Sequence, residues 1–166
     1  SADGEKKFAT GAPSKGGHFL IEHPAVVITI LAEGWATGMT VFESVKHSRV
    51  IVGFSAANLP VVAAALDWKG LCAVAGDNDP RQPCPWCLKN GEHLQNPPNL
   101  PRPEQCRCNP GFSAALEAAK IIGCGYAVPE FCEGTDWHDL FTERLAILEK
   151  EDELKTWRST PHKLRE

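Results

Sequence analysis

The feature that most constrains the fold is an alternation of short apolar runs with segments of helical periodicity. The longest apolar run, Ala25–Ala32 (AVVITILA), is rich in β-branched residues and has no polar face, which is typical of a central strand in a parallel sheet. The segment that follows, Trp35–Lys46, repeats apolar residues at helical spacing. This alternation continues along the chain and predicts an α/β fold, with a mainly parallel sheet of about four strands flanked by helices.

The other elements follow from the same patterns. We expect a short strand near His18–Ile21, main strands at Val26–Ala32, Val50–Phe54, Gly70–Gly76 and Cys124–Val128, and helices at Trp35–Lys46, Leu59–Trp68, Pro110–Ile122 and Leu140–Trp157. Asn58 is expected to cap the second helix and Gly123 to end the third. The last helix is expected to turn Leu140, Phe141, Leu145 and Leu148 inward.

Composition excludes several classes of protein. The chain has 166 residues, of which 43% are apolar and 23% charged, a balance typical of a soluble globular domain. No apolar run approaches the ~18–20 residues of a membrane span, so we expect no membrane partner. The net charge of −4 argues against a simple basic nucleic-acid-binding module. The seven cysteines are an odd number and no secretory signal is visible, which favours a cytoplasmic protein with free thiols or a metal site.

Acidic residues follow three of the expected strands. Glu33 comes directly after the first main strand, Asp77 and Asp79 after the third, and Asp136 and Asp139 after the fourth. The carboxyl ends of parallel strands meet at one edge of a sheet, where these groups could converge. Paired carboxylates suit Mg²⁺ or Mn²⁺. Alternatively, the Asp-Asn-Asp run is a polar turn, Glu33 a solvated acid beside a helix, and the last pair a helix cap.

The segment between the third and fourth main strands is rich in proline and cysteine. Its thiols form two close pairs, Cys84 with Cys87 and Cys106 with Cys108, a spacing that predicts one tetrahedral Zn²⁺ site. Bound metal would order a segment that has few apolar residues and no helical or strand pattern. The alternative is a disordered insert with free or oxidised cysteines. His93 is the natural substitute ligand, and Trp86 either stacks on a base of single-stranded DNA or packs inside the insert. Cys72 and Cys124 are expected in the core, and Cys132 is given no role.

The motifs, taken in order, resemble the Toprim domain, a metal-binding module shared by bacterial-type DNA primases, topoisomerases and some nucleases. Its pattern of a strand ending in Glu-Gly and a later strand ending in Asp-x-Asp is matched by ILAEG (Ile30–Gly34) and VAGDND (Val74–Asp79). The chain is still more similar to Toprim primases of phages, plasmids and other mobile elements. The segments that carry this resemblance are Lys6–Phe19, Ala32–Ser44, Gly53–Leu66, Asn109–Phe131 and Glu133–Phe141.

The resemblance covers about residues 6–142 apart from 80–108. It implies a Toprim-like Rossmannoid domain at 26–142, with a lead-in at 1–25, the zinc-binding insert at 80–109, and a C-terminal helix and tail at 143–166. Three features depart from the family. Ser55 stands where an aspartate is frequent, His138 stands where an asparagine is usual, and the Cys-rich insert is not typical.

The resemblance also implies a function: divalent-metal-dependent nucleotidyl transfer that makes primers on single-stranded DNA from nucleoside triphosphates. In this role Asp77 and Asp79 hold one or two Mg²⁺ or Mn²⁺ ions, and Glu33 serves as ligand, general base or general acid. Asp136 and Asp139 supply a further ligand. Lys6, Lys7 and Lys15 either contact template phosphates or are solvated, and His138 alters either the metal shell or a phosphate contact. A helicase or template-binding domain, in the same chain or another, is the expected partner. The alternatives are a metal-dependent nuclease and a non-catalytic module that binds DNA or a replication protein.

Overall fold

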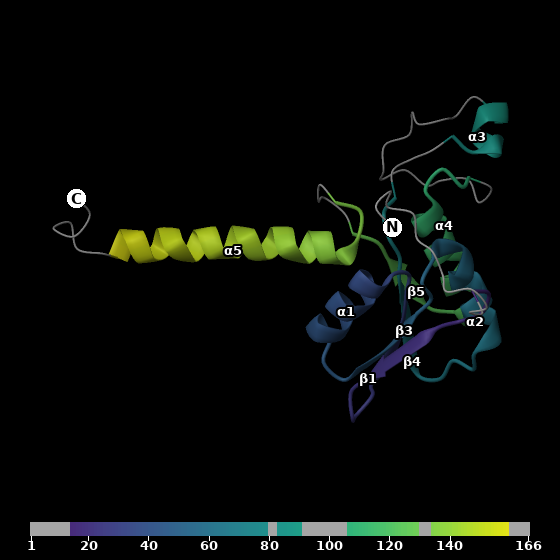
Figure 1. The fold of residues 1–166 in the computed structure, drawn as a ribbon, viewed down its shortest axis with the longest axis horizontal. Coiled ribbons are helices and arrows are strands. Elements are labelled where there is room, and N and C mark those ends of the chain that lie inside the picture. The colour runs from purple at the N-terminus through teal and green to yellow at the C-terminus, as the bar shows by residue number, and fades with distance from the viewer. Residues whose placement is uncertain (1–13, 80–82, 91–105, 130–133, 160–166) are drawn as a thin grey trace.

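The sheet of the molecule has five strands, in the order β1-β3-β2-β4-β5. The structure, a computed structural model, describes residues 14–79, 83–90, 106–129 and 134–159, with the backbone alone over 151–159. The strands are β1 (Phe19–Glu22), β2 (Ile28–Ala32), β3 (Ser48–Val52), β4 (Leu71–Ala75) and β5 (Gly125–Ala127). Figure 1 shows the sheet as the centre of the fold, with helices on both sides.

Four strands of this sheet are parallel, and β1 alone runs antiparallel, against β3. The predicted α/β class is therefore confirmed, and the sheet is compatible with a Rossmann-like fold. The short strand expected near His18–Ile21 is present as β1 and joins the four main strands at one edge of the sheet. It pairs on one side only, so it can be short and largely exposed.

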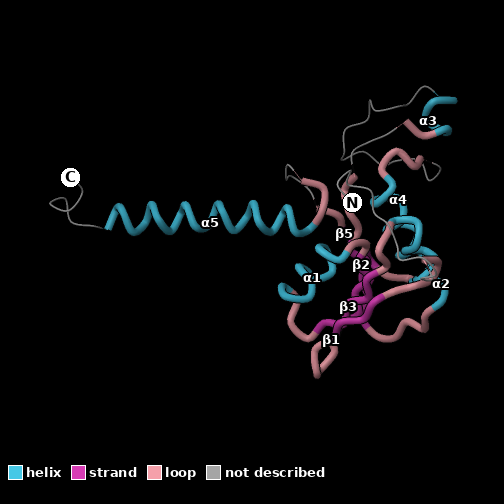
Figure 2. Tube along the Cα trace, in the orientation of Figure 1, coloured by secondary structure: helices cyan, strands magenta, loops and turns pink. Residues whose placement is uncertain are grey.

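Helices cover both faces of the sheet (Figure 2). Helix α1 (Trp35–Ser44) packs on one face, where its Val41 meets Ile30, Val50 and Val52 in a buried cluster. The other face carries a short 3₁₀ turn (Ala56–Asn58), α2 (Leu59–Ala65) and α4 (Pro110–Ile122). Here Leu31 and Val74 are buried against Leu59, Val62 and the alanines of α4. Successive residues of β2 thus enter opposite cores, which explains its uninterrupted apolar sequence.

Most predicted boundaries agree with the structure to within a few residues. Helix α4 spans the predicted residues, and Gly123 ends it in the left-handed conformation, with φ of 78°. Two boundaries differ more clearly. Strand β3 begins at Ser48, two residues before the predicted Val50, and α2 ends at Ala65 because Leu66 is extended. A short helix that the sequence pattern did not predict, α3 (Pro85–Asn90), lies in the cysteine-rich insert.

Helix α5 (Trp137–Ser159) begins three residues before the predicted Leu140 and extends away from the sheet (Figure 1). Its first residue fixes this start, because the indole N–H of Trp137 donates to Gly76 O at 3.1 Å. The predicted inward side is found only at the start of the helix, where Leu140 is half-buried. It was wrong for Phe141, Leu145 and Leu148, which are 40%, 43% and 55% exposed, since the helix leaves the body of the domain soon after it begins. Among the described residues, no helix combines the length and apolarity that a membrane crossing requires.

Asn58 is a structural clamp and does not cap α2 with its side chain, as the sequence had suggested. The side chain is buried and makes three hydrogen bonds: it accepts from Gly16 N and donates to Gly17 O and Gly53 O, at 2.7–2.8 Å. These bonds fasten the segment before β1 to the turn that follows β3. Asn58 therefore fixes the position at which β1 reaches the edge of the sheet.

We expect Asn58→Ala to lower the free energy of unfolding by about 1–3 kcal/mol, because it removes the partners of three backbone groups, one in a buried bond. Urea denaturation followed by circular dichroism measures this change. Asn90→Ala is the matched control: its amide donates to Trp86 O at an exposed position, so water can replace the bond and the change should stay within about 0.5 kcal/mol. Equal stability of Asn58→Ala and the unmodified chain would contradict the clamp.

Candidate metal centre and cysteine cluster

Glu33 and Asp77 lie side by side because β2 and β4 are adjacent parallel strands. Ala32 pairs with Ala75 at the carboxyl end of the two strands, and Glu33 N continues the pairing by donating to Ala75 O at 3.1 Å. The next residues of both strands therefore stand at the same edge. Both carboxylates are buried, with exposed fractions of 6% for Glu33 and 9% for Asp77. The structure thus brings together acids that are 44 residues apart in the sequence.

The start of α1 holds Asp77 in place. Thr37 Oγ1 donates a hydrogen bond of 2.8 Å to Asp77 Oδ1, and the backbone N–H of Asp77 donates to Glu33 Oε2 at 3.4 Å. Gly34 passes close to the same carboxylate, since a Cβ built there would lie 3.8 Å from Asp77 Oδ2. Sequence reasoning missed Thr37. Its signal was a threonine in the first turn of the expected helix, four residues after Glu33.

The start of α4 completes the arrangement. Gly111 N donates to Asp79 Oδ2 at 2.7 Å, so this carboxylate accepts one of the first backbone donors of the helix, where negative charge is stabilised. A Cβ on Gly111 would lie 2.5 Å from Asp77 O and 2.9 Å from Glu33 Oε2. All three predicted acids therefore surround the same point of the backbone, and only glycine fits there.

Two asparagines tie this edge of the sheet to α4. Asn109 caps the helix by accepting from Phe112 N at 2.9 Å, and its amide donates to Asn78 Oδ1 at 2.8 Å. Asn78 in turn donates to Pro129 O at 2.9 Å, and its backbone N–H donates to Thr135 O at 2.6 Å. The middle residue of the Asp-x-Asp run thus orients the two acids on either side of it. Sequence reasoning assigned no role to either asparagine, although the Asn-Pro-Gly start of α4 was a cap signal.

Asp136 and Asp139 form a reciprocal cap at the start of α5. Asp139 N donates to Asp136 Oδ1 at 2.9 Å, and Asp139 Oδ2 accepts from Thr135 N at 3.0 Å. These bonds correspond to the alternative interpretation of the pair as a helix cap, and its metal-binding role stays a prediction. His138 faces α1, with Nδ1 3.4 Å from Thr40 Oγ1, and Lys15 is exposed before β1. Their contacts with nucleic acid stay predictions as well.

The four cysteines of the insert come together as predicted. Their Sγ atoms all lie within 4.8 Å of one another. Cys84, Cys87 and Cys108 are 3–4% exposed and Cys106 is half-buried. The Cys87 thiol lies 3.4 Å from Cys106 Sγ, and Arg107 N donates to Cys84 Sγ at 3.4 Å. Four sulfur ligands in this arrangement can hold a metal ion and are consistent with structural zinc.

The thiols of the cluster differ in acidity. Burial raises the pKa of Cys84, but hydrogen bonds from the backbone of Arg107 and Cys87 and from neighbouring thiols outweigh it and lower the pKa to about 6. Burial raises the pKa of Cys87 and of Cys108, and the other thiols add to the rise for Cys87. These hydrogen bonds therefore favour the thiolate form of Cys84, the form in which a cysteine binds metal.

The cysteines outside the cluster and the tryptophan of the insert differ in burial and packing. All six cysteines of the described segments are free of disulfides, and Cys72 and Cys124 are half-buried rather than fully in the core as expected. Cys124 packs at the border of the main core. Trp86 is half-buried and packs on the cysteine cluster, which agrees with a packing role in the insert, while its stacking on DNA stays a prediction. Lys6, Lys7, His93 and Cys132 lie outside the described residues.

Among the described residues, three or more potential metal-binding His, Cys, Asp or Glu atoms come within 4.8 Å of one another only at the cysteines. The carboxylates of Glu33, Asp77 and Asp79 are thus more widely spaced than the thiols. Such spacing is appropriate to an open site, at which substrate oxygens supply further ligands, and the cysteine cluster has the closed form of a structural site.

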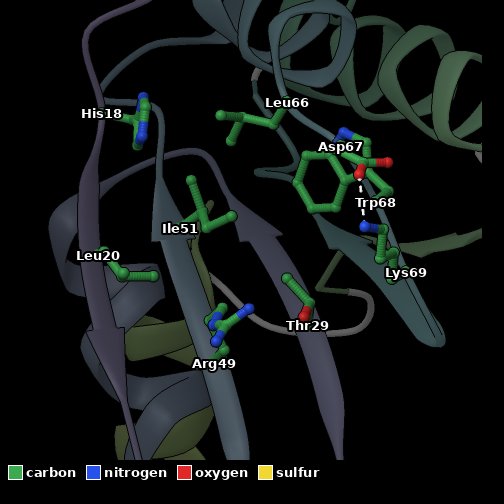
Figure 3. A pocket seen from close by; sticks show the side chains of 9 residues that line it. All are labelled: His18, Leu20, Thr29, Arg49, Ile51, Leu66, Asp67, Trp68 and Lys69. Carbon is green, nitrogen blue, oxygen red and sulfur yellow. Dashed lines mark ion pairs between the residues drawn. The ribbon is translucent and has the colours of Figure 1, made fainter. Parts of the chain in front are cut away.

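A hollow of about 390 Å³ lies on the face of the sheet that carries α2 (Figure 3). Sequence reasoning did not predict it. Its cations are balanced by acids: Lys69 pairs with Asp67 at 2.8 Å, and Arg49 pairs with Glu22 at 2.7 Å. None of the three candidate acids lines it. The lining residues are His18, Leu20, Thr29, Arg49, Ile51, Leu66, Asp67, Trp68 and Lys69.

Comparisons of the chain with protein-family models, with curated proteins and with solved structures find no match.

We expect Gly111→Ala to lower the free energy of unfolding by about 1–3 kcal/mol, because the added methyl group would overlap Asp77 O and crowd Glu33 Oε2. Chemical denaturation measures the change. Gly125→Ala is the matched control, since a Cβ there meets no atom within 4 Å. If both variants were equally stable, α4 would approach the acids less closely than the structure indicates.

Elemental analysis after gel filtration tests the cysteine cluster. We expect the purified chain to carry about one metal ion at the four thiols, and Cys87→Ser to lose most of it, because a buried ligand is removed. Cys72→Ser is the control, since Cys72 lies in β4 and outside the cluster. Retention of the metal by Cys87→Ser, or its loss from Cys72→Ser, would contradict this assignment.

Proposed function

We propose that this chain is the catalytic Toprim domain of a DNA primase of the type found in phages, plasmids and other mobile elements. The observation that carries the proposal is the meeting of Glu33, Asp77 and Asp79 around the first turn of α4, at the carboxyl edge of a parallel sheet. Phosphoryl-transfer sites of open α/β sheets occupy this edge. The order of sequence motifs supports the same family.

The acids fit Mg²⁺ or Mn²⁺ by the chemistry of their donors. Carboxylate oxygens are hard ligands, and Asp77 and Asp79 come from one short segment between two helices that fix their positions. Gly34 leaves no side chain beside the Asp77 carboxylate, so a triphosphate can approach, whereas Gly111 lets α4 pack closely against Asp77 and Glu33. When bound, a divalent cation supplies charge neutralisation at the phosphates and makes the attacking hydroxyl more acidic.

The remaining roles, which are cation binding, orientation of the carboxylate and acceptance of the proton, fall to residues of the chain. Asp77 and Asp79 hold the cation, and Thr37 keeps Asp77 oriented through its hydrogen bond. Glu33, which directly follows the adjacent strand β2, accepts the proton of the primer hydroxyl. The hydroxyl oxygen bonds to the α-phosphorus of the incoming nucleotide, and the bond from that phosphorus to pyrophosphate breaks. A template-binding or helicase partner, in the same chain or another, presents the single strand.

We further propose that the cysteine cluster holds a structural Zn²⁺. A closed set of four soft sulfur ligands is the usual structural zinc site. The cluster is joined directly to the acidic site, because Cys108 immediately precedes Asn109, the cap of α4. Ser113 Oγ also donates to Cys106 O at 3.2 Å. Zinc in the cluster would therefore hold the first turn of α4 in the position that Asp79 requires.

Primer synthesis on single-stranded DNA tests the function. We expect the chain, supplied with nucleoside triphosphates and Mg²⁺ or Mn²⁺, to make product, and Asp77→Asn and Glu33→Gln each to reduce the rate by at least about a hundredfold. The two variants should differ in Mn²⁺ binding measured by electron paramagnetic resonance: Asp77→Asn weakens it, and Glu33→Gln retains it. Asp67→Asn, which changes an exposed acid paired with Lys69, should keep full activity.

Two results would contradict the proposal. Cleavage of DNA without nucleoside triphosphates, lost in Asp77→Asn and Glu33→Gln, would identify a metal-dependent nuclease with the same acids. Absence of both activities with the partner domain present, together with DNA binding that these substitutions leave unchanged, would identify a non-catalytic binding module.

A further inference from the structure

Two exposed aromatic side chains stand beside the acidic site. Phe19, the first residue of β1, is 48% exposed, and Trp35, the first residue of α1, is 49% exposed. Their rings touch, with centroids 5.3 Å apart and planes at 66°. Trp35 follows Gly34, whose backbone passes next to the carboxylate of Asp77. The pair is therefore placed where a substrate of the acidic site would pass.

The side chains of this pair are held less firmly than those of two other tryptophans. The indole N–H of Trp68 donates to Ala63 O at 2.8 Å, and that of Trp137 donates to Gly76 O at 3.1 Å. Within the part of the chain that the structure describes, the Trp35 side chain makes no hydrogen bond, and its ring contact with Phe19 is edge-to-face. In an edge-to-face contact, the edge of one ring meets one face of the other ring. The remaining faces of the two rings are therefore not used by this contact, and a ligand can stack on them.

The charges at the carboxyl edge of the sheet act differently on the phosphates and on the bases of a nucleic-acid strand. The buried carboxylates of Glu33 and Asp77 repel phosphates that pass close by without a cation, but they do not repel an uncharged base. The exposed cation Lys15 and the exposed His18 lie on the segment directly before Phe19, which Asn58 fastens to the domain. Phosphates are therefore favoured toward Lys15, with a base toward the aromatic pair.

We propose that Phe19 and Trp35 form a platform on which one base of single-stranded DNA stacks beside the carboxylates. The inference deepens the proposed function and rests on it. Stacking on aromatic rings accepts any base, as a template-reading enzyme requires, because every base presents a flat π-face. The platform holds the strand at a fixed distance from Asp77 without reading its sequence.

Fluorescence anisotropy of a labelled single-stranded oligonucleotide tests the platform, in Mg²⁺ and without nucleotides so that no synthesis occurs. We expect Trp35→Ala and Phe19→Ala each to weaken binding about tenfold, the effect of losing a base–aromatic contact. Trp35→Phe, which retains a flat ring, should bind within about threefold of the unmodified chain. Leu71→Ala is the control: Leu71 is 61% exposed at the amino end of β4, away from the acids, and its loss should leave binding unchanged.

An abasic oligonucleotide of the same length separates stacking from charge. The unmodified chain and Trp35→Ala should bind this strand equally, since it has phosphates but no bases. Equal binding of the normal strand by both proteins would overturn the inference and leave the aromatic pair to a protein partner. If Trp35→Ala weakened binding of the normal strand and of the abasic strand by the same factor, the inference would also be overturned. Primer synthesis that depends on Asp77, with strand binding independent of Trp35, would reject the platform alone. Trp35-dependent binding without synthesis would reject the catalytic proposal alone.

Discussion

The parallel pairing of β2 with β4 is the constraint on which the candidate site depends. The register Ala32 with Ala75 places Glu33 and Asp77 at one edge, and the bond from Glu33 N to Ala75 O extends the pairing to the acid itself. A shift of one residue would turn every side chain of β2 to the opposite face and separate the carboxylates. The register is held by both cores at once, because Leu31 and Ile30 are buried on opposite faces. The geometry of the acids is thus secured by apolar packing on both sides of the sheet.

Bringing carboxylates together in a buried place costs free energy, and the fold supplies three compensations. Asp79 accepts from Gly111 N at the start of α4, where the backbone donors of the helix favour negative charge. Thr37 donates to Asp77, and the N–H of Asp77 donates to Glu33. These compensations come from three elements: α1, α4 and the loop after β4. The site therefore exists only in the assembled domain, a reason for its residues to lie far apart in the sequence.

The sequence correctly predicted those features of the fold that depend on interactions between residues close together in the chain. Helix α4 was predicted at its observed bounds, because its Asn-Pro start and Gly123 end are set by residues within the helix and next to it. Glu33, Asp77 and Asp79 stand just past the ends of β2 and β4, as predicted, whereas Asp136 and Asp139 cap α5. The errors arose where distant contacts decide. Asn58 was expected to cap α2, but buried bonds to Gly16, Gly17 and Gly53 engage its side chain. The apolar residues of α5 were assigned an inner side, although nothing in their spacing shows that the helix leaves the sheet.

The cysteine-rich insert is structurally part of the acidic site, although its sequence reads as a separate segment. Cys108 is followed by Asn109, which both caps α4 and donates to Asn78 between the two aspartates, and Gly111 comes two residues later. A segment with few apolar residues cannot fix these positions by core packing. A metal ion bound at the four thiols would supply folding free energy of another kind and would stabilise the first turn of α4. Since that turn donates to Asp79 and leaves space for Glu33, an ion at the thiols and one at the carboxylates would each favour the same position of α4. Binding of ions at the two centres would therefore be energetically coupled through four consecutive residues, Cys108 to Gly111.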